Sequence, residues 1–327
     1  MAEEDVKSHR MGHRLKRNLG MLISENLRVV EEQNLEQQRQ IPQLLKDIYE
    51  MCNEVKSLRG SNIRIMGSSA TGLSLASSDI DFLIRLQEDG TEQAFDETLY
   101  KLRSSKRKFI LINYVRKAKV PVISVRHYIS NINCDLTFDC PSLKRDDVLK
   151  NTELLRIYAE NCKVFKKLFI FIKTIFGKFK VFSAKHGGLS SYTHAIILIY
   201  YLVNRESCIF TDPLTNLIKI QRQHNAPLAE IFYNYLLFVR DELEFEIIDI
   251  IKIGAGSNYK GSKLTIIDPY LRKKDLARNL STSNLRLLQC MAHEWIRYIL
   301  AFEDKKLSLT TIKENVDYLY SESVSNC

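Results

Sequence analysis

The spacing of apolar residues divides the chain into a helical beginning, a middle of short β-type runs and a long helical end. From Met21 to Leu58 apolar residues recur every three to four positions, which predicts N-terminal helices. The polar stretch Glu31–Gln40 interrupts this pattern, and Pro42 follows it. Residues 1–20 are rich in charge and are predicted to form a loose N-terminal segment. We expect the helices of 21–58 to pack on the later helical part of the chain.

Between residues 59 and 145 the pattern changes to short runs rich in β-branched and aromatic residues, which predict strands. One helical segment, 92–103, separates the second run from the third. This alternation is typical of an α/β domain with a small sheet. The five runs are Ile63–Met66, Ile80–Leu86, Phe109–Val115, Val120–Val125 and Ile132–Phe138.

Residues 146–327 are predicted to form a mainly helical domain. Apolar residues from Leu154 to Ile172 lie at helical spacing, and the segments Tyr192–Leu202 and Leu228–Leu237 continue this pattern. The whole pattern therefore predicts an α/β part followed by a mainly helical part.

Charge and cysteine content narrow the class of protein. Of the 327 residues, 48 are Lys or Arg and 39 are Asp or Glu, and a net charge of +9 favours a polyanionic partner. The seven cysteines are scattered without a C-x-x-C pair, which argues against a disulfide framework or a zinc site. The longest apolar stretch, Ala195–Val203, is much shorter than the ~20 residues of a membrane helix. We expect no membrane association and a location in the cytoplasm, with the nucleus as the alternative.

The motif with the clearest chemistry is G-S-S-A-T-G-L, which starts at Gly67 and is followed by S-S-D-I-D. Gly67 is expected to follow a strand and to open a helical turn, where backbone N–H groups and the Ser68 hydroxyl can hold a triphosphate. Asp79 and Asp81 are two residues apart on a β-type run and therefore share one face of the strand. Their mutual repulsion would be relieved by a divalent cation between them.

Metal-dependent phosphoryl transfer usually needs a third carboxylate, because two ions activate the attacking hydroxyl and stabilise the leaving phosphate. Alternation of apolar residues in 132–138 places Asp135 on the polar face of its strand. Asp139 shares that face and is the rival candidate. Asp135 is favoured because Asp139 lies at the end of the strand.

These motifs together resemble the DNA polymerase beta nucleotidyltransferase superfamily. Four features of the helical half resemble, more narrowly, the terminal uridylyltransferases and the cytoplasmic poly(A) polymerases of the Gld-2 type. They are Asn151–Leu155, Lys173, Gly188–Tyr192 and Ile267–Tyr270. The resemblance covers roughly residues 45 to 300. It implies a two-lobed fold, in which a polymerase-beta-like α/β lobe faces a helical poly(A)-polymerase-associated lobe across a central cleft. It also implies a template-independent enzyme that adds UMP or AMP to RNA 3′ ends from UTP or ATP, releases pyrophosphate, and uses Mg²⁺ or Mn²⁺.

The resemblance also implies roles for the residues already singled out. Gly67 and Ser68 would hold the triphosphate, and Asp79, Asp81 and Asp135 would bind the metal ions. Asp135 would in addition help to activate the RNA 3′-hydroxyl.

In the helical half, the resemblance implies five further nucleotide contacts. Asn151 would contact the ribose 2′-hydroxyl, and Thr152 would lie beside the base. Lys173 and Ser191 would contact the phosphates, and Tyr192 would stack on the base. Lys173 lies in an otherwise largely apolar run, where an unpaired ammonium is costly and a triphosphate would neutralise it. The alternative is a lysine that extends from a core helix to solvent.

Two positions depart from the family pattern. The family usually has a second lysine four residues after the first, but here that residue is Gly177, and the adjacent Lys178 is the expected replacement. Many uridylyltransferases carry a uracil-selecting histidine shortly after the D-P-[FY] motif, which starts here at Asp268, but this chain has Lys274 there. A lysine can donate a hydrogen bond to a uracil carbonyl but offers no acceptor to an adenine amino group. The sequence therefore slightly favours UTP, with a Gld-2-type poly(A) polymerase as the alternative.

Other readings share parts of this pattern. An oligoadenylate or nucleotide second-messenger synthase has the same loop and carboxylates, but the motif Asp268–Tyr270 argues against it. A catalytically silent RNA-binding scaffold or partner subunit has no chemical need for all three carboxylates. No RRM, KH or zinc-knuckle pattern is present, so a partner RNA-binding protein is expected to supply specificity. Basic clusters that could line an RNA path are 106–108, 116–119, 178–180 and 272–274.

Overall fold

The computed structural model divides into two compact units. Residues 30–160 form one unit, which we call the sheet unit, and residues 1–29 with 161–327 form the other, which we call the helical unit. Each unit is described by itself. The structure describes residues 11–104, 108–117, 120–143, 146–206, 210–211, 218–219, 226–252 and 260–301.

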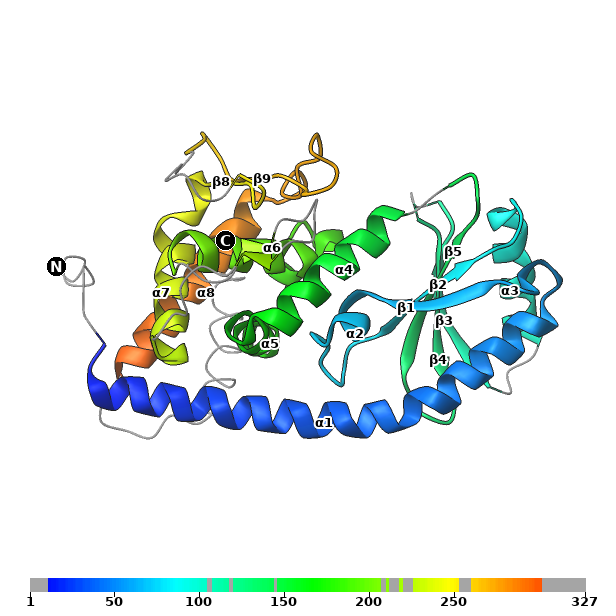
Figure 1. Ribbon diagram of the computed structural model, residues 1–327, viewed down its shortest axis with the longest axis horizontal. Coiled ribbons are helices and arrows are strands. Elements are labelled where there is room, and N and C mark those ends of the chain that lie inside the picture. Colours follow the sequence, from blue (N-terminus) through cyan, green and yellow to red (C-terminus); the bar gives the residue numbers. More distant parts are fainter. Residues whose placement is uncertain are drawn as a thin grey trace. The chain divides into compact units, whose positions relative to one another are not determined.

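Helix α1, His13–Glu54, is one element of 42 residues (Figure 1). The prediction of a loose segment over 1–20 followed by separate helices is wrong from His13 onward. The helical spacing of apolar residues extends further towards the N-terminus than expected, because Leu15 and Leu19 are fully buried. The helix continues through Pro42, whose ring lies on the exposed side of the helix.

The two halves of α1 belong to different units, so the expectation that 21–58 packs on the helical domain holds up to Val29 and is wrong for the rest. After Val29 the chain belongs to the sheet unit. Apolar residues at helical spacing in the second half, among them Leu44, Ile48 and Met51, join one buried cluster with the strands. The expected boundary therefore failed because one continuous helix carries two separate apolar stripes.

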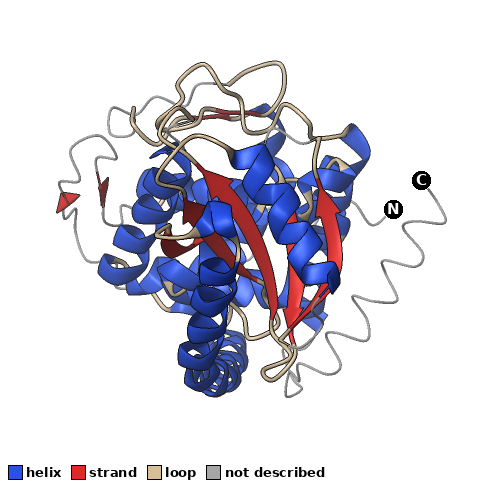
Figure 2. Ribbon diagram, turned by 90° about the vertical axis from the view of Figure 1, so that its right-hand side faces the viewer, coloured by secondary structure: helices blue, strands red, loops and turns tan. Residues whose placement is uncertain are grey.

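The sheet unit contains the five predicted strands, in the order β1-β2-β5-β4-β3 (Figure 2). Strands β2 and β5 pair in parallel, and the other neighbours pair antiparallel. Helix α3 and the second half of α1 pack on one face, where Phe95 meets Phe138 edge to face with 6.2 Å between ring centroids. The bounds are β1 Asn62–Met66, α2 Gly67–Thr71, β2 Ile80–Arg85, α3 Thr91–Ser104, β3 Phe109–Val115, β4 Val122–His127, β5 Asn133–Asp139 and α4 Asp146–Asn161, with the 3₁₀ turn η1 Lys56–Leu58.

The helical unit is built around aromatic packing. Phe171, Phe232 and Trp295 meet edge to face, with centroid distances of 5.1 to 6.2 Å. The apolar stripe predicted from Leu154 to Ile172 is divided between two helices, because Cys162 caps the second through a hydrogen bond from Phe165 N to its Sγ. No helix in the described residues is long and apolar enough to cross a bilayer. The elements are α5 Lys163–Phe176, η2 Lys180–Phe182, η3 Ala184–His186, α6 Ser191–Asn204, β6 Phe210–Thr211, β7 Ile218–Lys219, α7 Leu228–Asp241, η4 Leu243–Phe245, β8 Ile247–Ile248, β9 Thr265–Ile266 and α8 Thr282–Ala301.

A buried carboxylate fastens α1 to the sheet. Asp47 is 1% exposed and accepts hydrogen bonds from Lys108 Nζ (2.6 Å), Gln43 Nε2 (2.9 Å) and His127 Nε2 (3.0 Å). Burial acts to raise the pKa of Asp47, but the hydrogen bonds from Lys108, Gln43 and His127 outweigh it and lower the pKa to about 2.

This depressed pKa predicts an acid-sensitive contribution to stability. The contribution is fully present above pH ~4, where the unfolded carboxyl is ionised, and is lost as the pH falls through the folded pKa of about 2. We expect Asp47 to account for a loss of about 2 kcal/mol of unfolding free energy across this window. Denaturant unfolding at pH 2 to 7 measures it, and Asp47→Asn should flatten the curve between pH 4 and 2. An unchanged slope in that variant would contradict this role.

Candidate active site

The predicted phosphate loop begins where β1 ends. Met66 is the last residue of β1, and Gly67 opens the short helix α2, as the sequence predicted. Gly67 has a φ of +65°, and a Cβ at this position would lie 2.4 Å from Oδ2 of Asp81. Only glycine accommodates both this backbone conformation and this approach. The loop therefore lies directly against one of the predicted metal-binding carboxylates.

Strand register brings the predicted carboxylates together. Asp81 on β2 is paired with Asp135 on the parallel neighbour β5, so both half-buried side chains lie on the same face of the sheet. Asp79 precedes the first residue of β2 and is exposed. Burial raises the pKa of the adjacent thiol of Cys134 to about 12. The negative charges of Asp79, Asp81 and Asp135 also raise the pKa of this thiol, so all three carboxylates act on the same point of the sheet.

The two candidates for the third carboxylate have different surroundings. Asp135 Oδ1 accepts a hydrogen bond from Ser124 Oγ at 2.5 Å, and Asp135 lies beside Asp81. Asp139 is fully buried, and its Oδ2 accepts from Arg85 Nε at 2.9 Å and Nη2 at 2.8 Å. It lies four residues further along β5, roughly 13 Å from Asp135. This arrangement supports Asp135 as the third carboxylate and gives Asp139 a structural ion pair.

The carboxylates suit a cation that shares its ligands with a substrate. In the part of the chain that the structure describes, no three His, Cys, Asp or Glu side chains are grouped so that they could hold a metal ion by themselves. Mg²⁺ usually takes only one or two protein carboxylates and completes its octahedron with phosphate oxygens and water. Asp81 and Asp135 on adjacent strands, with Asp79 beside them, fit such an open site for Mg²⁺ or Mn²⁺.

Residues that the sequence analysis did not select hold the loop before Asp79. Asn34 Nδ2 donates to the carbonyl of Ser74 (2.9 Å), and Gln37 Nε2 donates to the carbonyl of Ala76 (2.9 Å). Both amides lie in the polar stretch of α1. From the sequence this stretch was only an interruption of the apolar pattern, because nothing local indicates which backbone groups its amides meet.

Helix α4 brings two predicted nucleotide contacts to the sheet unit. The backbone N–H of Gly67 donates to Thr152 Oγ1 at 3.2 Å, so Thr152 contacts the phosphate loop itself. Asn151 precedes it on the helix and is half-buried. The roles of these two residues at the ribose and base stay predictions.

The predicted phosphate lysine lies in the helical unit. Lys173 is in the last turn of α5 and is 8% exposed. At Gly177 a Cβ would lie 2.3 Å from the carbonyl oxygen of Lys173, so the helix end has no room for the second lysine of the family at that position. Lys178, the expected replacement, follows immediately and is exposed.

Ser191 is the first residue of α6, directly after the N-cap Ser190, whose Oγ accepts from Thr193 N at 3.2 Å. Its predicted phosphate contact therefore falls on the first turn of a helix, where backbone N–H groups favour an anion.

Three other predicted residues of the helical unit lie together. Burial raises the pKa of Tyr192, and the nearby charges of Asp268 and Tyr270 raise it further. Asp268 is 1% exposed, and its Oδ2 accepts from Lys274 Nζ at 3.1 Å. Its Oδ1 accepts from the backbone N–H of Tyr270. Asp268 and Lys274 therefore form an ion pair, and the charge of Asp268 acts on the hydroxyl of Tyr192.

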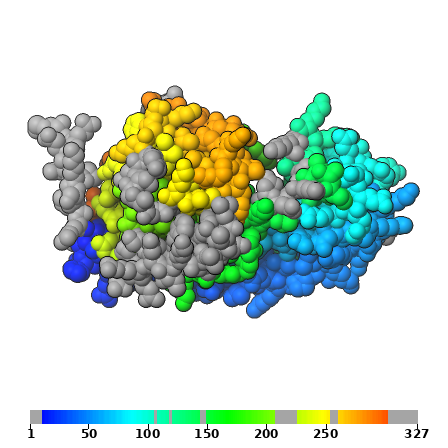
Figure 3. Space-filling model, turned by 45° about the horizontal axis from the view of Figure 1, so that its top comes forward, coloured from blue at the N-terminus to red at the C-terminus, as the bar shows by residue number. Residues whose placement is uncertain are grey.

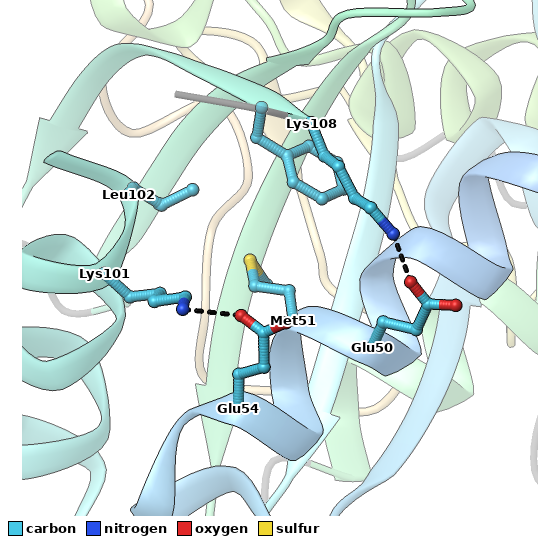
Figure 4. Close-up of a pocket in the computed structure, with 7 residues that line it drawn as sticks. Glu50, Met51, Glu54, Lys101, Leu102 and Lys108 are labelled. Atoms are coloured by element: carbon cyan, nitrogen blue, oxygen red, sulfur yellow. Dashed lines mark hydrogen bonds and ion pairs between the residues drawn. The ribbon is translucent and has the colours of Figure 1, made fainter. Parts of the chain in front are cut away.

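A separate cavity in the sheet unit has none of these residues in its lining. It measures about 300 Å³ and lies between α1, α3 and β3 (Figure 4). Lys101 pairs with Glu54 at 2.5 Å, and Lys108 pairs with Glu50. The charged side chains that line the cavity are thus already paired with one another. The lining residues are Glu50, Met51, Glu54, Lys101, Leu102, Lys108 and Phe109.

Known proteins are similar to this chain in the sequence of the palm region and in fold. Residues 22–160 match the family of mitochondrial-like poly(A) RNA polymerases over its central palm domain. A solved structure of the Cid1 poly(U) polymerase with Mg and 3′-dATP bound superposes with a TM-score of 0.68 at 17% identity, covering 89% of this chain and 98% of that one. Residues 22–160 are therefore similar in sequence to this palm domain, and the solved structure has the same fold as the chain. The expected fold class, a polymerase-beta-like α/β lobe with a helical lobe, is confirmed.

Curated proteins of similar sequence extend the comparison. The poly(A) RNA polymerase GLD2 of Danio rerio is 31% identical over 141 residues, which is 42% of this chain and 28% of that protein. The poly(A) RNA polymerase cid12 of Schizosaccharomyces pombe is 24% identical over 220 residues, 67% of this chain and 62% of that protein. The chain thus spans just over a quarter of the length of GLD2. Figure 3 shows the sheet unit, which carries most of the matched palm domain, mainly in blue to cyan.

Proposed function

We propose that this protein is a template-independent RNA 3′-terminal nucleotidyltransferase, which adds UMP or AMP to an RNA end and releases pyrophosphate. The observation that carries the proposal is that Gly67, Asp81 and Asp135 lie next to one another in this order. A glycine loop suited to phosphates touches one carboxylate, and strand pairing aligns the second with it. The names of the relatives and of the structural neighbour, which are poly(A) and poly(U) polymerases, support the same chemistry.

The proposed reaction is in-line attack of the RNA 3′-oxygen on the α-phosphorus of the nucleotide. A P–O bond to the RNA forms as the bond to the pyrophosphate breaks. Bound Mg²⁺ would lower the negative charge on the reacting oxygens. Gly67 and Ser68 hold the triphosphate, and Lys173 and Ser191 add a cation and a donor. Because Ser124 donates to Oδ1 of Asp135, Oδ2 of this carboxylate can orient the attacking hydroxyl and take up its proton.

The remaining nucleotide contacts are proposed for the sugar and base. Asn151 binds the ribose 2′-hydroxyl, Thr152 lies beside the base, and Tyr192 stacks on it. Lys178 adds a positive charge near the phosphates.

For the base, we propose UTP, with ATP as the alternative. Asp268 holds the Lys274 ammonium at 3.1 Å, and an ammonium has further N–H donors that can meet a uracil carbonyl. The ion pair holds the Lys274 ammonium at Asp268, and the charge of this carboxylate acts on Tyr192.

Removing this ammonium should change base preference. We expect Lys274→Ala to raise the KM for UTP about tenfold and to leave the KM for ATP nearly unchanged, since one hydrogen bond to a base is worth ~1–3 kcal/mol. Lys263→Ala, an exposed lysine of the same unit, is the matched control. Equal changes for both nucleotides would show that Lys274 does not read the base.

The proposed function is tested by extension of a 5′-labelled unstructured RNA with Mg²⁺ and each NTP separately. We expect extension with UTP, and its loss in an Asp79→Ala/Asp81→Ala variant. Extension with ATP alone would keep the mechanism and favour a Gld-2-type poly(A) polymerase. Triphosphate binding without extension of several RNAs by any NTP would favour the silent scaffold or partner subunit instead.

Substrate choice is proposed to come from outside the chain. The sequence carries no RNA-binding module beside the nucleotidyltransferase fold, so a partner RNA-binding protein would deliver the RNA 3′ end. The cytoplasm is the proposed location. Co-purification of RNA with and without such a partner measures how much selectivity the chain itself has.

A further inference from the structure

The order of the strands fixes the side from which an RNA end reaches the carboxylates. Strand β1, which leads into the phosphate loop, pairs with one edge of β2, and β5 pairs with the other edge, followed by β4. In-line displacement puts the attacking oxygen opposite the leaving pyrophosphate. With the triphosphate on the β1 side, the RNA 3′-hydroxyl arrives from the side of β5 and β4.

Two alternating residues of β4 and the residue directly after this strand continue the face that carries the carboxylates. Ser124 is paired with Asp135, and Arg126 is paired with Asn133. Tyr128 follows the last residue of β4, and its N–H donates to the carbonyl of Lys108 at 2.8 Å, which continues the ladder towards β3. Along β4, Arg126 lies roughly 7 Å from Ser124 and Tyr128 roughly 13 Å from it.

Arg126 is an exposed cation held in a defined position. Its Nε donates to Asn133 Oδ1 at 3.0 Å. Among the described residues it has no carboxylate partner, whereas Arg85 is paired with Asp139 and Arg116 with Asp96. The terminal nitrogens of Arg126 can therefore bind a phosphate, which a guanidinium does with two parallel hydrogen bonds.

Tyr128 is 67% exposed although it is a large aromatic residue. An exposed ring beside an unpaired arginine is the combination with which proteins bind single-stranded nucleic acid, because the ring stacks on any base and the cation follows the backbone. Tyr128 lies further along the chain from Ser124, the partner of Asp135, than Arg126 does. An RNA strand that runs from Asp135 along this face would therefore meet Arg126 first and Tyr128 second.

We propose that Arg126 and Tyr128 form the subsite for the 3′ end of the RNA, in which Arg126 binds a backbone phosphate and Tyr128 stacks on an upstream base. The proposal rests on the proposed function, since it gives that site its second substrate. It also accounts for an arginine that has no carboxylate partner among the described residues on the face that carries the proposed catalytic aspartates.

The test is RNA binding by the full chain, followed as fluorescence anisotropy of a labelled single-stranded RNA at several salt concentrations without NTP. We expect Arg126→Gln and Tyr128→Ala each to weaken binding about tenfold. Arg126→Gln should also reduce the slope of log affinity against log salt by about 0.7, the value for one phosphate contact of a single strand, whereas Tyr128→Ala should not change it. Arg126→Lys should keep the slope, and Tyr128→Phe should bind like the wild type because it keeps the ring.

Matched controls are Arg103→Gln and Tyr100→Ala, which remove the same side chains from α3 on the opposite face of the sheet. Wild-type affinity in both β4 variants, or an equal loss in the controls, would overturn the subsite.

Kinetics separate this inference from the proposed function. In RNA extension, the β4 variants should raise the KM for RNA and leave the KM for NTP unchanged. If the wild type extends RNA and the Arg126 and Tyr128 variants have the same KM for RNA as the wild type, the proposed function is supported and the proposed RNA subsite is contradicted. If the wild type extends no RNA but the binding pattern holds, the proposed function fails and an RNA-binding face remains.

Discussion

An Asp135→Asn variant is expected to extend RNA at least about a thousandfold more slowly than the wild type while keeping nearly its full stability. The carboxylate is half-buried, paired in register with Asp81 and without an ion pair among the described residues, so its loss would remove charge that the proposed metal ions need and little packing. Bound metal ions contribute several kcal/mol to such reactions, and each 1.36 kcal/mol is a tenfold change in rate. Single-turnover extension and denaturant unfolding of the same preparation measure both effects.

The matched control is Asp139→Asn, the rival carboxylate on the same strand and face. It should retain wild-type activity per folded molecule but lose about 2 kcal/mol of unfolding free energy, because Arg85 would lose the partner of a charged hydrogen bond to a fully buried oxygen. The reverse pattern, with activity lost only at Asp139, would show that the third carboxylate has been assigned to the wrong residue.

A Gly67→Ala variant is expected to lose activity at least a hundredfold. The added methyl group would lie 2.4 Å from Oδ2 of Asp81 and would force either the phosphate loop or that carboxylate to move. A misplacement of about 1 Å can cost a hundredfold in rate. The positive φ of +65° adds about 1–2 kcal/mol of backbone strain.

Gly60→Ala separates strain from misplacement. Gly60 lies in the same unit with a φ of +73°, but a Cβ there would meet only Gln87 Cγ at an ordinary 3.7 Å. Both variants should therefore unfold at lower denaturant concentrations, whereas only Gly67→Ala should lose activity. Equal activity in the two variants would mean that the close approach of Gly67 to Asp81 has no part in catalysis.

Local sequence patterns predicted the sheet unit well because its strands alternate apolar and polar residues, and alternation determines which face each side chain occupies. That is why Asp81 and Asp135 could be assigned to one face before any pairing was known. The place of Gly67 could likewise be predicted from the sequence around it, since its motif requires a strand before the glycine and a helical turn after it. The register that brings the two aspartates side by side needed the structure.

The long helix α1 shows where sequence patterns failed. Its two apolar stripes have the same spacing, and nothing in that spacing indicates that one packs in the helical unit and the other on the sheet. The polar stretch between them contains Asn34 and Gln37, whose partners are backbone carbonyls about 40 residues away. The pairing of Lys274 with Asp268 was also hidden, because two residues in an irregular segment have no periodicity that would place them together.

The measurement that most directly tests in-line attack by an RNA 3′-hydroxyl follows both products of the reaction. Purified wild-type protein is incubated with Mg²⁺, UTP or ATP, and RNAs identical except for a 3′-hydroxyl or a 3′-deoxy end. We expect one pyrophosphate for each nucleotide added to the 3′-hydroxyl RNA, and neither product with the 3′-deoxy RNA or with Asp79→Ala/Asp81→Ala. Pyrophosphate release that is independent of the RNA 3′-hydroxyl, or the absence of extension by a folded protein that binds the triphosphate, would contradict the proposed mechanism.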